Sequence, residues 1–286
     1  CRDKSASCSD DNKIKIEMSG TKPTSGKIKI TNGSVDQTSS SMTIGDYIVS
    51  YDKDNNKQQA QELYKGILCK AVTAATDGNV PQGKFAYGDE YICELGDNDT
   101  KTFYVLETKG DNVSLIMNAN VDSNGKAIIP SNIPTDKGLI AWVTKEDYLS
   151  AGGTEANFGS YGKNDLGPIT AAKALKEKTK GWTKLDSTQI TLPTCRQVAI
   201  AGGDTTWNEN SNSFGSHLSE WLYNNLNDSK SKVADVYGYW TSTVSMSSSN
   251  SAWHVSTFGY LSNIYGITYI GCGVRPVITI SKSNLS

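Results

Sequence analysis

The sequence predicts an α+β protein, and two observations support this. Apolar residues recur at every second position in some segments, as in strands, and at every third or fourth position in others, as in amphipathic helices. The 286 residues include 26 Gly and 14 Tyr against 5 Phe, which favours a chain rich in loops and strands. The net charge of −2 argues against a nucleic-acid-binding surface, which would be basic and clustered.

The N-terminal part is expected to contain a tether and a small strand-helix segment. Residues 1–13 are polar and typical of a flexible tether. Within the segment, residues 14–83, apolar residues alternate between 14 and 56, which predicts short antiparallel strands. The period then changes, because apolar residues of 57–75 fall on one helical face, and a helix is predicted there.

Residues 84–286 are expected to form a second, larger domain. Strands are predicted at 101–106 and 113–117, with a hairpin turn between them at 109–112. The run from Thr144 to Asp147 resembles a capping box and predicts a short helix that stops at Gly152 and Gly153.

Three further helices and a group of strands complete the predicted domain. One helix begins near Pro168 and ends at Gly181, because proline is favoured at the start of a helix. A short helix is predicted at 195–201, and another at 216–226, where four large apolar residues share one face. From residue 236 to 280 the pattern is again that of strands.

Six cysteines occur, at positions 1, 8, 69, 93, 195 and 272. They form no CxxC motif or His-Cys cluster, so no metal site is predicted. An even number would suit disulfides in an exported protein, and Cys69–Cys93 is the preferred pair, because one cysteine follows the predicted helix and the other lies on a nearby strand. Buried free thiols are the alternative.

The cysteine at position 1 bears on the cellular location of the protein. A mature chain that starts with cysteine looks like a bacterial lipoprotein, whose signal peptide is cut just before a lipid-modified cysteine. The alternative is a chain trimmed of a signal or membrane anchor. Either way the protein is expected at the cell surface, outside the cytoplasm, with membrane contact only through that lipid or anchor. No apolar run approaches the ~20 residues of a membrane span.

Three sequence blocks frame the most informative window, residues 244–272, which contains no Lys, Glu, Gln or Asp. The blocks are Gly-Tyr-Trp-Thr-Ser-Thr at 238–243, Ala-Trp-His-Val at 252–255 and Gly-Val-Arg-Pro-Val-Ile at 273–278. In this order they resemble the C-type-lectin-fold variable proteins of diversity-generating retroelements. The upstream residues 101–106, Trp142, 181–182 and 190–194 are similar to the same proteins, so the resemblance covers about residues 84–281.

The resemblance implies a C-type-lectin fold of the formylglycine-generating-enzyme-like subtype. In this family a reverse transcriptase misincorporates opposite template adenines, and the copy replaces the 3′ end of the gene. Diversified AAC codons never yield Lys, Glu, Gln, Trp or Met, so Met246 departs from the rule. The implied partner is a variable protein or other cell-surface ligand, with no nucleic acid, no cofactor and no catalytic residues.

We predict that side chains of the window carry the binding, because Tyr offers large contact area at low entropic cost while Ser and Asn offer adaptable hydrogen bonds. Strand alternation directs His254 away from its apolar neighbours, towards the surface. Trp240 and Trp253 are expected in the core, and Arg275 in a structural contact. The predicted ligand-binding residues are Val244, Met246, Ser247, Ser249, Asn250, His254, Ser256, Thr257, Phe258, Tyr260, Ser262, Ile264, Tyr265, Ile267, Thr268, Tyr269, Ile270 and Cys272.

Other functions are less well supported by the residues. A thiolate at Cys195 would be stabilised by a helix start, but its surroundings lack the motif of the formylglycine-generating enzymes. Glu155, Asn157 and Asp165 match no calcium-loop spacing, so a solvated loop is expected there. The sequence therefore predicts a non-enzymatic ligand-binding surface protein. The alternatives are a pilin-like or fibre subunit that displays a lectin-fold domain, and a calcium-dependent carbohydrate lectin.

Overall fold

The computed structural model describes residues 41–44, 47–52, 57–62, 66–72, 85–130, 133–204, 206–208, 215–226 and 236–286. The chain divides into two compact units, residues 1–65 and 66–286. The predicted tether and the strands predicted before residue 41 lie outside the described residues. The observed boundary between residues 65 and 66 precedes the expected boundary between residues 83 and 84.

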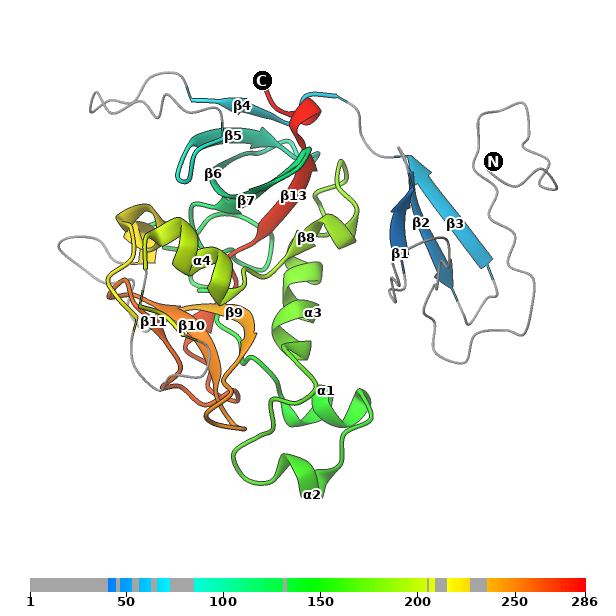
Figure 1. Ribbon diagram of the computed structural model, residues 1–286. Coiled ribbons are helices and arrows are strands. Elements are labelled where there is room, and N and C mark those ends of the chain that lie inside the picture. Colours follow the sequence, from blue (N-terminus) through cyan, green and yellow to red (C-terminus); the bar gives the residue numbers. More distant parts are fainter. Residues whose placement is uncertain are drawn as a thin grey trace. The chain divides into compact units, whose positions relative to one another are not determined.

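The first unit contains a three-stranded antiparallel sheet in the order β1-β2-β3 (Figure 1). Its strands are β1 (Ser41–Ile44), β2 (Tyr47–Asp52) and β3 (Lys57–Glu62). The prediction of strands is confirmed here, but the helix predicted over 57–75 is wrong. All six residues of β3 pair with β2, and Cys69 begins a strand of the other unit. Pairing with the preceding strand thus overrides the helical pattern of the segment itself.

The second unit is built on a six-stranded sheet in the order β4-β5-β6-β7-β13-β8. Its neighbouring strands are all antiparallel. The last strand of the chain, β13, lies inside this sheet between β7 and β8 (Figure 1). The strands are β4 (Cys69–Ala71), β5 (Glu90–Glu94), β6 (Thr100–Lys109), β7 (Asn112–Met117), β8 (Ile190–Thr191) and β13 (Val277–Ser281).

The two ends of the second unit meet at one edge of this sheet. The Leu68 N–H donates to the carbonyl of Asn284 at 2.8 Å, and the Ala71 N–H donates to that of Ser286 at 2.7 Å. The predicted hairpin is confirmed nearby: Lys109 pairs with Asn112, and Gly110 takes the positive φ of 58° that such a two-residue turn needs.

Local capping signals place most of the helices. These are α1 (Lys145–Ser150), α2 (Glu155–Phe158), α3 (Ile169–Lys178) and α4 (Cys195–Gly202). Thr144 and Thr194 cap α1 and α4 by accepting the N–H of the residue three positions on. Three helices are thus confirmed near their predicted positions, and α3 ends earlier than expected.

The helix predicted over 216–226 is wrong in type. The chain instead forms two short 3-10 turns, η2 (Glu220–Leu222) and η3 (Asn224–Leu226). The physical reason is that the carbonyls of Trp221 and Leu222 accept hydrogen bonds from Arg275, which an α-helix would reserve for its own N–H groups.

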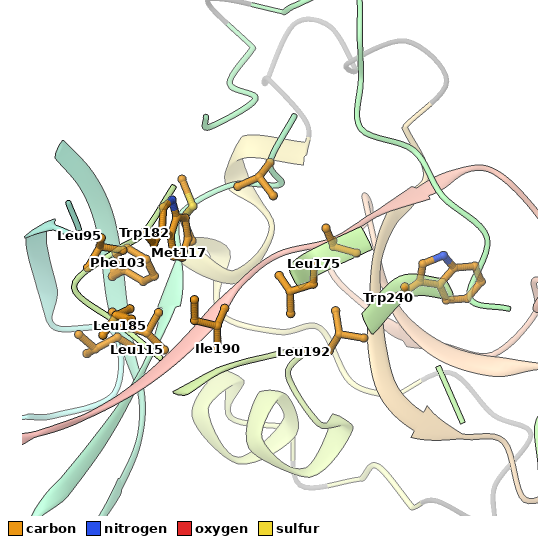
Figure 2. Packing of buried hydrophobic residues seen from close by; sticks show 14 of the residues in the cluster. Leu95, Phe103, Leu115, Met117, Leu175, Trp182, Leu185, Ile190, Leu192 and Trp240 are labelled. Atoms are coloured by element: carbon orange, nitrogen blue, oxygen red, sulfur yellow. The ribbon is translucent and has the colours of Figure 1, made fainter. Parts of the chain in front are cut away.

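A second, four-stranded sheet carries the window, in the order β11-β10-β9-β12. Its strands are β9 (Gly238–Val244), β10 (Ala252–Ser256), β11 (Leu261–Ser262) and β12 (Cys272–Gly273). A core cluster joins it to the main sheet: Figure 2 shows buried side chains from Phe103 and Trp182, through Ile190 and Leu192, to Trp240. Together the sheets, antiparallel except for the parallel pair of β12 and β9, and the flanking helices confirm the α+β class.

Candidate functional site

The aromatic frame of the window is buried, as predicted. Trp240 on β9 and Trp253 on β10 are both fully buried. The Trp240 indole N–H donates to the carbonyl of Ile140 at 2.8 Å, which links the ring to a segment one hundred residues earlier in the chain. Burial of such large rings supplies much of the stability of a domain, so both are structural residues.

Arg275 has the structural role that the sequence predicted. Its guanidinium is fully buried and donates to the backbone carbonyls of Met117, Leu222 and Trp221, the last at 3.0 Å from Nη2. The same group lies 5.2 Å from the ring centroid of Tyr239, a cation–π contact. Arg275 therefore ties the η2 turn to the end of β7.

Much of the window lies on the surface. Met246, Ile270, Ile264 and Phe258 are 56–66% exposed. Of the thirteen large hydrophobic side chains exposed among the described residues, five fall in this window. The predicted contact residues that are exposed or half-buried are Val244, Met246, Ser247, Ser249, Asn250, Phe258, Tyr260, Ile264, Tyr265, Thr268, Tyr269 and Ile270. We call this set the exposed face.

Six predicted contact residues are instead buried, so the expectation that they face solvent is wrong: His254, Ser256, Thr257, Ser262, Ile267 and Cys272. For His254 the reason is that β10 is an inner strand with both faces covered. Its imidazole lies 5.7 Å from the Trp240 ring and 4.9 Å from the Tyr265 ring, centroid to centroid. Alternation correctly separates the two faces but does not tell whether the second face is open.

Backbone and core contacts account for the burial of three other positions. The Ser256 hydroxyl accepts the N–H groups of Phe258 and Tyr260, each at 3.3 Å, and so holds the turn after β10. The Ile267 carbonyl accepts from the backbone of residues 142 and 143, and its side chain joins the core. Cys272 forms the short strand β12 beside β9. These contacts hold in place the backbone from which the exposed side chains project.

A cavity of about 410 Å³ opens within the exposed face. It is lined mostly by aromatic and hydroxyl side chains, none of which carries a formal charge when histidine is neutral. The sequence missed Tyr237, although its position directly before the first frame block was a usable signal. The lining residues are Tyr237, His254, Ser256, Thr257, Phe258, Tyr260, Ser262, Ile264 and Tyr265.

His254 is the one ionisable imidazole in the cavity wall. Its burial lowers the pKa to about 3, against an opposing influence of the Ser262 backbone, so the ring is neutral at physiological pH. Neither ring nitrogen has a hydrogen-bond partner within the described part of the chain. A neutral imidazole offers one donor and one acceptor, and the described residues leave both without a partner.

Three tyrosines form one side of the face. The rings of Tyr237, Tyr265 and Tyr269 contact one another, with centroids 4.9–5.7 Å apart. Burial raises the pKa of Tyr265, and burial together with the neighbouring phenol of Tyr237 raises that of Tyr269 to about 12. These phenols therefore stay neutral at physiological pH.

The cysteines of the second unit are either paired or buried. Cys69 and Cys93 form a disulfide between directly opposite residues of β4 and β5, which confirms the preferred pairing. Burial raises the pKa of Cys195 to about 12 and raises that of Cys272 as well. Neither free thiol is therefore disposed to act as a nucleophile.

The described residues also show no arrangement typical of a metal site. They contain no group of three His, Cys, Asp or Glu side chains placed to hold an ion, and Glu155 is instead paired with Lys145 at 2.6 Å. No helix in the described part of the chain has the length and hydropathy to span a bilayer. Comparisons with protein-family models, curated proteins and solved structures found no match.

Proposed function

We propose that this chain is a non-enzymatic ligand-binding protein with a C-type-lectin fold of the formylglycine-generating-enzyme-like subtype. It is displayed outside the cytoplasm, and a retroelement diversifies its window at 244–272 so that it binds variable protein partners. One observation carries the proposal: the aromatic frame residues are buried, while proposed contact residues close to them in sequence are exposed. Trp240 and Trp253 are fully buried, whereas Met246, Ile264 and Ile270, in the same stretch, are more than half exposed.

The topology supports the lectin-like part of the proposal. The last strand, β13, lies inside the main sheet, and the two ends of the second unit are hydrogen-bonded together. Between β8 and β13 the described residues form α4, the η2 and η3 turns, a separate four-stranded sheet and the loops of the exposed face. Such an arrangement lets loops vary while both ends of the frame stay fixed.

The chemistry of the exposed face supports a protein partner. Apolar and aromatic side chains such as Phe258, Ile264 and Tyr269 lie among serines, a composition typical of protein-binding surfaces. The usual contribution of one partner to a stable interface is about 800 Å². Concentration of exposed apolar groups in one window is a mark of an interaction site.

Two further features favour an exported binding protein over an enzyme. The Cys69–Cys93 disulfide is typical of proteins that mature in an oxidising compartment. Burial raises the pKa values of the Cys195 and Cys272 thiols, which disfavours the thiolate that a cysteine-dependent oxidase would need.

The proposal is tested by sequencing the source genome around the coding region for residues 238–280. We expect a near-copy of this region beside a reverse-transcriptase gene, with differences restricted to template adenines. Codons of frame residues such as Trp240 should be identical in both copies. Differences spread over all four bases, or the absence of a near-copy from a complete genome, would contradict diversification.

A further inference from the structure

The cavity in the exposed face has the size and lining of a binding pocket. Its volume of about 410 Å³ lies within the roughly 300–1,000 Å³ of small-ligand sites. Tyr237, Phe258, Tyr260 and Tyr265 contribute aromatic walls, and such rings favour stacked or edge-to-face contact with another ring. An aromatic occupant would therefore be well matched to the walls.

The unpaired imidazole of His254 in the cavity wall favours a polar group on that occupant. His254 is fully buried, it lines the cavity, and neither of its ring nitrogens is hydrogen-bonded to any described residue. An unsatisfied buried donor or acceptor costs free energy, which a hydrogen bond from the occupant would recover. A hydroxyl group can donate to one imidazole nitrogen or accept from the other.

The occupant is also expected to be uncharged. None of the lining side chains bears a formal charge at neutral pH, so a charged group would lose its hydration without gaining a counter-charge. A phenol meets all three requirements, because it is aromatic, neutral and carries a hydroxyl group.

The rim of the pocket indicates that a protein delivers this group. Phe258 and Ile264 line the cavity, yet 56% and 59% of their surfaces remain exposed, and Tyr269 packs against the lining residues Tyr237 and Tyr265. A free small molecule would leave this apolar rim in water. A protein that inserts one side chain would cover the rim as well.

We propose that the cavity is a specificity pocket for a tyrosine side chain of the protein partner, whose hydroxyl group hydrogen-bonds to His254. This inference rests on the proposed function, since it assumes that the exposed face binds a protein. It adds a chemical preference: the partner must present an exposed tyrosine, while the surrounding exposed residues select among proteins that do so.

The direct test is a titration of the full chain with small probes, followed through the imidazole nitrogens by NMR. The chain contains only two histidines, His217 and His254, so two sets of ring signals are expected. We expect N-acetyl-tyrosinamide to shift the His254 signals saturably. N-acetyl-phenylalaninamide, which lacks only the hydroxyl group, should bind about tenfold more weakly, the usual effect of one hydrogen bond.

A variant assigns the difference to the imidazole. His254→Phe keeps a ring of similar shape but removes both nitrogens, so the preference for the tyrosine probe over the phenylalanine probe should disappear. Near-ultraviolet circular dichroism checks that this variant is folded. The titration of the unaltered protein needs no variant and stands by itself if His254→Phe does not fold.

Several outcomes would overturn the inference. Equal affinity for both probes without movement of the His254 signals would remove the proposed hydrogen bond, and failure of both probes to bind would remove the pocket. Binding of p-cresol with exclusion of N-acetyl-tyrosinamide would show that the site takes a free small molecule. Each of these could occur while the genome still shows adenine-restricted variation, so the pocket can fail without the proposed function failing.

Discussion

At the scale of single residues, the buried imidazole of His254 links folding to pH. Its pKa is about 3 in the folded protein, against an ordinary value of 6.5. Between these values the unfolded chain binds a proton that the folded chain does not. The free energy of unfolding attributable to this residue is therefore unaffected above about pH 6.5 and falls as the pH is lowered towards 3.

Replacement of His254 by phenylalanine should remove this dependence. Over the interval from about pH 6 to pH 4, one proton contributes a slope of about 1.4 kcal/mol per pH unit, so His254→Phe should lose stability less steeply than the original protein by that amount. Urea denaturation at several pH values measures the slopes. His217→Phe controls for the loss of a histidine at an exposed position, and parallel curves for His254→Phe and the original protein would contradict a buried neutral ring.

Substitutions of buried frame residues and of exposed-face residues should change the free energy of unfolding by different amounts. Trp240→Ala removes a fully buried ring and should lower the free energy of unfolding by about 3–5 kcal/mol. Ile270→Ser changes a side chain that is 63% exposed and should stay within about 0.5 kcal/mol. Thermal or chemical denaturation compares the two, and similar losses would mean that Ile270 belongs to the core.

Among the elements, the two 3-10 turns at 220–226 are hydrogen-bonded to Arg275, and we expect this residue to hold them in place. Arg275→Met removes the donors that satisfy the carbonyls of Trp221, Leu222 and Met117 and leaves these groups buried without a partner. We expect a loss of about 3–5 kcal/mol, as for other broken buried polar networks. Hydrogen exchange should accelerate at 220–226 before other parts of the unit.

A conservative variant separates charge from geometry at this position. Arg275→Lys keeps the positive charge but loses the planar fork that reaches several carbonyls at once. It should recover only part of the stability that Arg275→Met loses. Unchanged exchange at 220–226 in both variants would show that Arg275 does not hold these turns.

The elements that the sequence predicted correctly are those with local causes. Thr144 and Thr194 cap helices through hydrogen bonds to residues three positions away, and Gly110 supplies a positive φ at a two-residue turn. The errors arise where a segment pairs with another strand or hydrogen-bonds to a distant side chain. Residues 57–62 pair with β2, and Arg275 takes carbonyls of a segment more than fifty residues earlier.

The candidate site shows the same division. The sequence predicted the buried frame residues Trp240 and Trp253 because large aromatic residues at strand positions are usually core. It misplaced His254, because the ring that covers it, Tyr265, comes from a later loop. The cavity depends on that loop and on Tyr237 together, so no local pattern could reveal it.

For the molecule as a whole, the proposed function gives different parts of the second unit different tasks. The six-stranded sheet, the helices and the buried tryptophans form the core of this unit, and we propose that the exposed face carries the binding residues. If this division is correct, the face should accept many sequences without loss of folding. This tolerance is the central claim, because a diversified binding protein cannot function without it.

The most direct test compares two libraries of the full chain by the fraction of members that resist proteolysis. One library randomises the exposed residues Met246, Ser249, Phe258, Ile264 and Ile270, and the control library randomises the buried residues Trp240, Trp253, Val255, Val274 and Ile278. We predict that most members of the first library and few members of the second remain folded. An equal collapse of both libraries would show that the window is part of the core, and would contradict a variable binding face.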